Sequence, residues 1–182
     1  MTSTAVTSIE IDLTFDRETS PATASQIRGG YRVTVDGTRV VRFHDESETE
    51  WREWQPAYFG EFLTVELGKL FDALLAIKDG EIGRYETAEA SIESWNLAYA
   101  FERLSGEHVR VAARYRPSDE DSSLRLVPPS ERGFVVEFDA LAREAVGCGR
   151  AYIDFAMEFG HDPDAKPVSA IRERIDRLRF ED

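Results

Sequence analysis

Histidine, cysteine and paired carboxylates are the side chains of this sequence that could carry out catalysis, and none stands in a recognisable catalytic pattern. The histidines His44, His108 and His161 are far apart in the chain and form no HxxxH or HExxH spacing, so they predict no metal-binding helix. His161 is followed by Asp162 and Asp164, but a solvent-exposed turn rich in Asp and Pro accounts for this run. We therefore predict no metal site and no cofactor.

The single cysteine, Cys148, excludes a disulfide within the chain. It falls on an apolar helical face, whereas a nucleophilic thiolate needs exposure and a neighbouring base or helix N-terminus. Carboxylate pairs such as Glu86 and Glu89 could act in acid–base chemistry, but chance pairs are common among 35 acidic residues. The sequence contains no GxSxG, Walker A or GxGxxG motif opening a helix. We predict no catalytic residues; whether the chain is an enzyme stays open, with the balance against it.

Net charge is the most marked property of the chain. Its 35 acidic and 22 basic residues give a net charge of −13 over 182 residues. An acidic surface repels nucleic-acid phosphate and anionic membranes, so we expect neither general nucleic-acid binding nor membrane association, and a basic protein is the natural partner. The same composition is typical of proteins from salt-adapted or GC-rich hosts. The charge therefore reflects either a partner or the host.

The segment His44–Glu61 mixes acidic and aromatic side chains and is the strongest candidate for a binding surface. Trp51, Trp54 and Tyr58 share one face if the segment is helical, and exposed Trp and Tyr are common anchors of protein interfaces. The alternative is that these aromatic rings cap the core beneath a solvated acidic face. The predicted interface residues are Asp45, Glu46, Glu48, Glu50, Trp51, Glu53, Trp54 and Tyr58.

Apolar spacing predicts three helices, at about 64–78, 139–159 and 168–179. Thr64 and Asp139 are the expected N-caps of the first two helices, and Pro167 opens the third. Two apolar stripes carry the first two predictions: Leu67, Leu70, Phe71, Leu74 and Leu75, then Leu141, Ala145, Cys148, Tyr152, Phe155 and Phe159. The third helix is rich in arginine. It could dock on the domain's own acidic surface, mediate self-association or contact a partner.

Period-two alternation predicts the strands. A hairpin is expected with its turn at Asp36-Gly37, a favoured type I′ pair that would set Val35 opposite Thr38. Glu81–Glu93 reads as a loop with a short strand. The other predicted strands are Ile9–Phe15, Trp95–Phe101, Val109–Tyr115, Leu124–Val127 and Phe134–Phe138. Residues 1–182 are thus expected to form one α+β domain with a mostly antiparallel sheet of about 5–7 strands, the helices packed on it, and a flexible start at residues 1–7.

These features favour a non-catalytic protein-binding domain, and in its most specific version an immunity- or antitoxin-like inhibitor of a basic toxin. The chain is similar to small toxin-immunity proteins in size, charge and element order, although it shares no motif with them. One alternative is an enzyme or small-ligand binder with a pocket between sheet and helices, lined by Trp95, Tyr99 and Tyr152. Another is a self-associating structural subunit or homodimer. Without a signal sequence or an apolar run of roughly 18–20 residues, a cytoplasmic location is expected.

Overall fold

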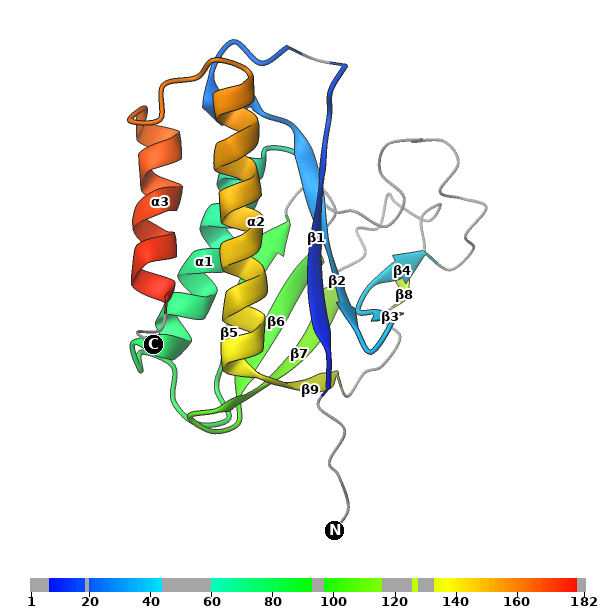
Figure 1. Ribbon diagram of the computed structural model, residues 1–182. Coiled ribbons are helices and arrows are strands. Elements are labelled where there is room, and N and C mark those ends of the chain that lie inside the picture. Colours follow the sequence, from blue (N-terminus) through cyan, green and yellow to red (C-terminus); the bar gives the residue numbers. More distant parts are fainter. Residues whose placement is uncertain are drawn as a thin grey trace.

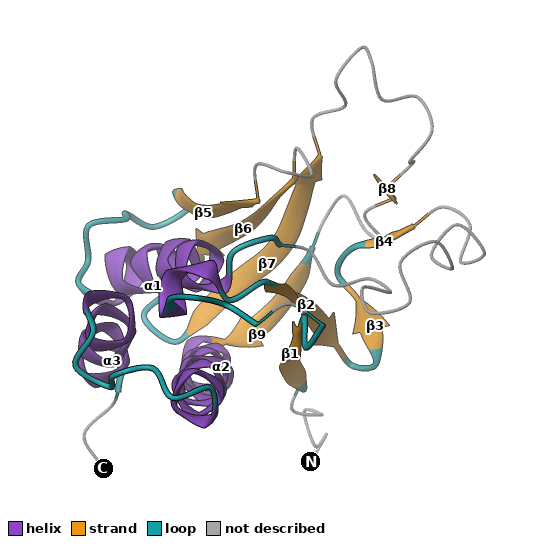
Figure 2. Cartoon of the chain, turned by 90° about the horizontal axis from the view of Figure 1, so that it is seen from above, coloured by secondary structure: helices purple, strands orange, loops and turns teal. Residues whose placement is uncertain are grey.

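The computed structural model describes residues 7–18, 20–43, 60–92, 97–115, 126–127 and 133–179. It shows an α+β fold in which three helices lie on one side of a four-stranded antiparallel sheet (Figures 1 and 2). A three-stranded antiparallel sheet lies beside it, and the two sheets share one core, in which the rings of Tyr31 and Tyr99 stack with centroids 5.2 Å apart. The predicted fold class is therefore confirmed, although the strands form separate sheets where one was expected.

The strands form three groups. The three-stranded sheet has the order β1 (Ile9–Phe15), β2 (Gly29–Val35) and β3 (Thr38–Arg39), with the 3₁₀ turn η1 (Ala24–Gln26) between its first two strands. The four-stranded sheet has the order β5 (Thr87–Ile92), β6 (Leu97–Arg103), β7 (His108–Tyr115) and β9 (Phe134–Glu137). A two-stranded pair joins β4 (Arg42–Phe43) to β8 (Leu126–Val127).

The predicted hairpin forms at its turn and then diverges. Asp36 and Gly37 have φ angles of 47° and 73°, as a type I′ turn requires, and Val35 pairs with Thr38 as expected. One further hydrogen bond, from the Val40 N–H to the Val33 carbonyl over 2.9 Å, continues the hairpin just past β3. The chain then leaves it, and β4 pairs with β8, far along the chain. The expected strand is therefore split into two short ones.

The helices are α1 (Leu63–Lys78), α2 (Phe138–Glu158) and α3 (Lys166–Leu178). Their predicted extents are right to within two residues, but the predicted N-caps are wrong. Phe62 and Glu137 occupy the cap positions, and neither gives a side-chain capping bond. Main-chain carbonyls of neighbouring segments take the free N–H groups instead: Leu63 donates to Ile27 over 3.0 Å and Phe138 to Glu107 over 2.8 Å.

Small residues on α2 let the helices pack closely. A Cβ atom added at Gly149 would lie 2.8 Å from both Phe71 of α1 and Ile175 of α3, so this position admits no side chain without displacement. On the same helix Tyr152 is fully buried and its hydroxyl lies 2.6 Å from the Thr64 hydroxyl. Thr64 thus joins α1 to α2 rather than capping α1.

The arginine-rich helix α3 docks on the chain's own α1. Arg174 forms a two-bond ion pair with Asp72, with N···O distances of 2.8 and 3.1 Å, and Arg177 pairs with Asp79 over 2.7 Å. The Lys78 ammonium donates to two carbonyls at the end of α3. Of the three roles open for this helix, the structure shows intramolecular docking.

No helix in the described ranges combines the length and the apolar composition needed to cross a bilayer.

Candidate functional site

All eight predicted interface residues lie outside the described residues. They are Asp45, Glu46, Glu48, Glu50, Trp51, Glu53, Trp54 and Tyr58. The same holds for Trp95, for His44 and for residues 1–6 of the expected flexible start. The interface at this segment therefore stays a prediction. The candidate site described below lies on another surface, formed by described residues.

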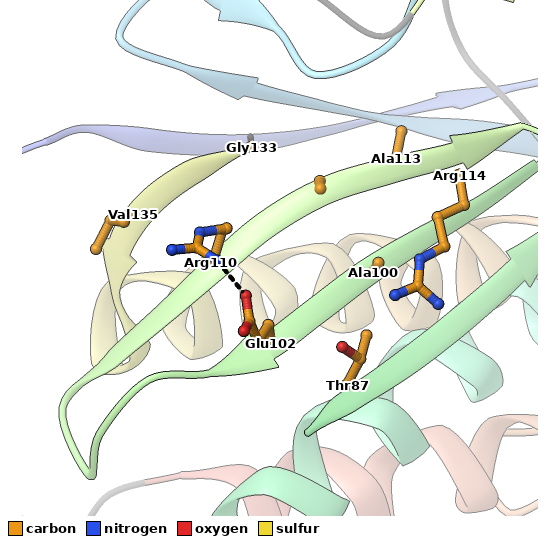
Figure 3. A pocket seen from close by; sticks show the side chains of 9 residues that line it. Thr87, Ala100, Glu102, Arg110, Ala113, Arg114, Gly133 and Val135 are labelled. Atoms are coloured by element: carbon orange, nitrogen blue, oxygen red, sulfur yellow. Dashed lines mark hydrogen bonds and ion pairs between the residues drawn. The ribbon is translucent and has the colours of Figure 1, made fainter. Parts of the chain in front are cut away.

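That surface is the face of the four-stranded sheet turned away from the helices, which we call the outer face. Side chains alternate along each strand, so Val109 and Val111 of β7 are buried toward the helices while Arg110 and Arg114 point outward. Figure 3 shows outward residues from all four strands around one hollow. The lining residues are Thr87, Ala100, Glu102, Arg110, Ala112, Ala113, Arg114, Gly133 and Val135.

Small side chains create the hollow, which has a volume of about 580 Å³. Ala100 of β6 pairs with Ala112 of β7, so the middle of the sheet carries only methyl groups on this side. Ala98 and Ala100 are 8% and 4% exposed although they face outward, because longer side chains stand around them. Strand β6 is therefore covered on both sides at these two positions.

Two ion pairs form the walls of the hollow. Arg110 donates to Glu102 across the β6–β7 pair over 2.5 Å, as the dashed line in Figure 3 shows. Arg114 pairs with Glu89 of β5, reaching across β6. All four side chains are partly exposed, so each pair contributes little to stability, about 0–1 kcal/mol. Each arginine is opposed by a carboxylate, which makes the walls charge-balanced.

The other predicted chemical groups are not brought together. Glu86 accepts a hydrogen bond from the Gly83 N–H over 2.6 Å, whereas Glu89 pairs with Arg114, so this carboxylate pair does not share a site. His108 lies exposed on β7, and His161 follows α2. Across the described ranges, no group of three or more His, Cys, Asp or Glu side chains could hold a metal ion.

Titratable groups inside the core are held neutral by burial. Burial, together with the nearby carboxylates of Glu144 and Asp12, raises the pKa of the Cys148 thiol to about 12. Burial also raises the pKa of the Tyr31, Tyr99 and Tyr152 hydroxyls. Cys148 is thus not a nucleophile, as its place in the helix predicted. Tyr99 and Tyr152 are 1% and 0% exposed and belong to the core, so they do not line an open pocket as the ligand-binding hypothesis expected.

The sequence contains a signal for the outer face, although no site was predicted there. In the predicted strand Val109–Tyr115, Arg110 and Arg114 occupy the polar positions of the alternation. A short turn at Ser105-Gly106 would set Glu102 opposite Arg110, as observed. The position of β5 next to β6, which brings Glu89 within reach of Arg114, could not be predicted from the sequence.

Comparison of the chain with protein families, with curated proteins and with solved structures finds no match.

Proposed function

We propose that this protein is a non-catalytic protein-binding domain that holds a basic partner by electrostatic complementarity, and most specifically an immunity- or antitoxin-like inhibitor. One observation carries the proposal: in the described part of the chain, many exposed carboxylates form no ion pair after the arginines have paired with other acids of the fold. They are distributed over the described surface at Glu10, Glu18, Glu81, Glu107, Glu137, Asp139, Asp154, Asp162 and Glu173.

This distribution matters because unpaired surface charges set the long-range field of the protein. Arginines on both sides of the molecule, such as Arg110 and Arg174, are already bound to carboxylates of the same chain. The net charge of −13 is therefore presented to solvent as excess acid. Such a field attracts a basic protein, speeds its association and makes the complex sensitive to salt.

The test is affinity co-purification of the tagged protein from its host lysate across a salt gradient. We expect a stoichiometric basic protein that salt releases. Charge reversal of the predicted interface, by Glu48→Lys with Glu50→Lys and Glu53→Lys, should weaken this capture without unfolding the domain. Recovery of the protein alone at the lowest salt would contradict the proposal.

A matched control separates a local interface from overall charge. Reversal at Glu18, Asp154 and Glu173, which are exposed and far from that segment in the chain, adds the same six charges and gives −13 + 6 = −7 in both variants. Equal loss of capture in the two variants would mean that only net charge acts. Trp51→Ala then distinguishes an anchor, whose loss weakens capture, from a core residue, whose loss unfolds the domain.

The hollow on the outer face supports a second candidate, a small-ligand binder. A volume of about 580 Å³ lies within the range of ligand sites, and Arg110 and Arg114 could each receive a carboxylate in place of their present partners. Thermal unfolding with a panel of small dicarboxylates tests it. Stabilisation that Arg110→Ala abolishes would support this candidate, whereas no shift with any member of the panel would count against it.

A further inference from the structure

Strand β5 is an outer strand of the four-stranded sheet, paired with β6 on one side alone. The direction of its main-chain groups follows from the ladder, because these groups alternate between the two sides of a strand. The Arg103 N–H donates to the Glu86 carbonyl, so this carbonyl points toward β6. Every second residue after Glu86 likewise points its groups toward β6, and Thr87, Glu89 and Ser91 point their N–H and C=O groups away from the sheet.

These outward groups have no partner in the described part of the chain. No hydrogen bond reaches the main chain of Thr87, Glu89 or Ser91 from that side. Helix α1 packs against β5, whose residues Ala88, Ala90 and Ile92 are buried, and in Figure 2 β5 ends the row of strands on the side far from β1–β3. The strand reads TAEASI and contains neither proline nor lysine, the residues that commonly protect an edge from pairing.

The chain segment that contains this edge is acidic, although Asp79 and Glu89 are paired with Arg177 and Arg114 from other elements. Residues 79–92 carry four acids and one arginine, a balance of −4 + 1 = −3. Glu81, Glu86 and Glu89 are exposed, and Glu89 stands on the outer face in the middle of the edge strand. A strand added beside β5 would place every second side chain on this outer face, next to Glu89. Lysine or arginine at those positions would meet the Glu89 carboxylate, which also pairs with Arg114.

We propose that the β5 edge is the docking site for an extended segment of the basic partner, which adds to the four-stranded sheet as a further strand. The inference rests on the proposed function, since it takes its partner's charge from there. Main-chain hydrogen bonds to Thr87, Glu89 and Ser91 supply affinity, and basic side chains over the outer face supply selectivity. A second copy of this chain is a poorer occupant, because two chains of −13 repel each other.

The experiment measures binding of a synthetic peptide of about eight residues in which lysine and valine alternate, a pattern that places basic side chains on one face of a strand. Ser91→Pro removes one outward N–H without touching the β5–β6 ladder, so the domain should stay folded. Ser91→Ala is the matched control, because it removes the hydroxyl and keeps the N–H. We expect Ser91→Pro to weaken binding about tenfold or more and Ser91→Ala to change it less than about twofold.

A change in the peptide provides a check that does not depend on the fold of any variant. N-methylation at alternate residues of the peptide blocks its hydrogen bonds to β5 and should abolish binding, whereas a glutamate–valine peptide should not bind at all. Equal affinity of the wild-type chain and Ser91→Pro for the lysine–valine peptide would overturn the inference. So would a wild-type dimer that Ser91→Pro converts to a monomer in analytical ultracentrifugation, because the edge would then hold a second copy.

Failure of this inference and failure of the proposed function are distinguishable. If Ser91→Pro captures the basic partner from lysate as well as the wild-type chain does, the binding function stands and the β5 edge is excluded as its site. If no basic partner is captured but the peptide binds in a manner sensitive to Ser91→Pro, the edge is a strand-binding site and the proposed function fails.

Discussion

Strands β1 and β5 both lie at the edge of a sheet, yet the chain treats their outward main-chain groups differently. In β1 the Ile11 N–H donates to the Glu144 carboxylate over 3.3 Å, and the Ile11 carbonyl accepts from the Cys148 thiol over 3.0 Å. Both side chains come from α2, which packs along β1. In β5 the corresponding groups of Glu89 meet no described partner.

The difference follows from where helices α1 and α2 lie relative to the two edge strands. Helix α2 covers the edge of the smaller sheet and seals it with side-chain hydrogen bonds, one of the devices that prevent unwanted strand pairing. Helix α1 instead packs against β5 and, within the described part of the chain, gives no hydrogen bond to its outward main-chain groups. An open edge is a liability unless something binds there, so the contrast itself favours a binding role for β5.

Proline substitution gives the largest expected effect and tests the contrast directly. Ile11→Pro removes a buried side chain and the N–H that Glu144 binds, and should lower the free energy of unfolding by about 3–5 kcal/mol. Ser91→Pro removes an N–H that no described group binds, and should cost less than about 1 kcal/mol. Urea unfolding at neutral pH measures both. Equal losses would mean that the two edges do not differ.

Removing the Glu144 side chain, which α2 contributes to the β1 edge, should have a smaller effect on the free energy of unfolding. Glu144→Ala leaves the Ile11 N–H without its acceptor and should destabilise the domain by about 1–2 kcal/mol. The control is Glu144→Gln, which keeps an acceptor oxygen and should cost less. Amide hydrogen exchange at Ile11 should accelerate in the alanine variant, whereas exchange at Ser91 is already fast in the wild-type chain. Slow exchange at Ser91 would show that the β5 edge is covered.

The sealed edge was predicted in part, because its elements carry strong local patterns. Ile9–Phe15 was read correctly as a strand, and Leu141, Ala145 and Cys148 as one buried helical face. The contact between these two elements could not be predicted, because Glu144 and Ile11 are 133 residues apart in the chain and no local sequence pattern indicates that they meet.

Elements whose partners are distant in the chain were predicted least well. The hairpin turn at Asp36-Gly37 is a local property and was right, whereas the departure of β4 toward β8 depends on a pairing across more than eighty residues. The N-caps failed for the same reason, because carbonyls of Ile27 and Glu107 took the role assigned to local side chains. Edge status is likewise a property of strand order, so β5 was seen as a short strand within a loop but not as an edge.

Alkaline pH should lower the stability of the fold through Cys148, whose thiol donates to the main chain of β1. Burial raises the pKa of this thiol from 9.0 to about 12, so between these values the unfolded chain loses its proton while the folded chain keeps it. The folded state then binds more protons, and stability, complete below pH 9, falls as pH rises toward 12. The loss from Cys148 should be on the order of 1 kcal/mol at pH 10.

Cys148→Ser is the matched variant for this experiment, because a hydroxyl can still donate to the Ile11 carbonyl but does not titrate in this range. Urea unfolding at pH 7, 9 and 10 should give a flatter decline for the variant than for the wild-type chain. Buried Tyr31, whose pKa is also raised by burial, adds its own loss above pH 10 in both proteins. Identical declines would mean that Cys148 does not contribute.

The smallest effect on stability is expected at the open edge, where it separates folding from binding most cleanly. Glu89→Lys breaks a partly exposed ion pair and puts two cations side by side with Arg114, which should cost less than about 1 kcal/mol. The same change removes the carboxylate that a basic strand would meet, so binding of the lysine–valine peptide should weaken and lose part of its salt dependence. Adding Arg114→Glu restores the ion pair in reverse and returns the carboxylate to the outer face on β7, two strands further from the edge. Stability should then recover fully, but binding only in part, because the carboxylate no longer lies next to the added strand. Full recovery of both would mean that the outer face as a whole, rather than the β5 edge, attracts the peptide.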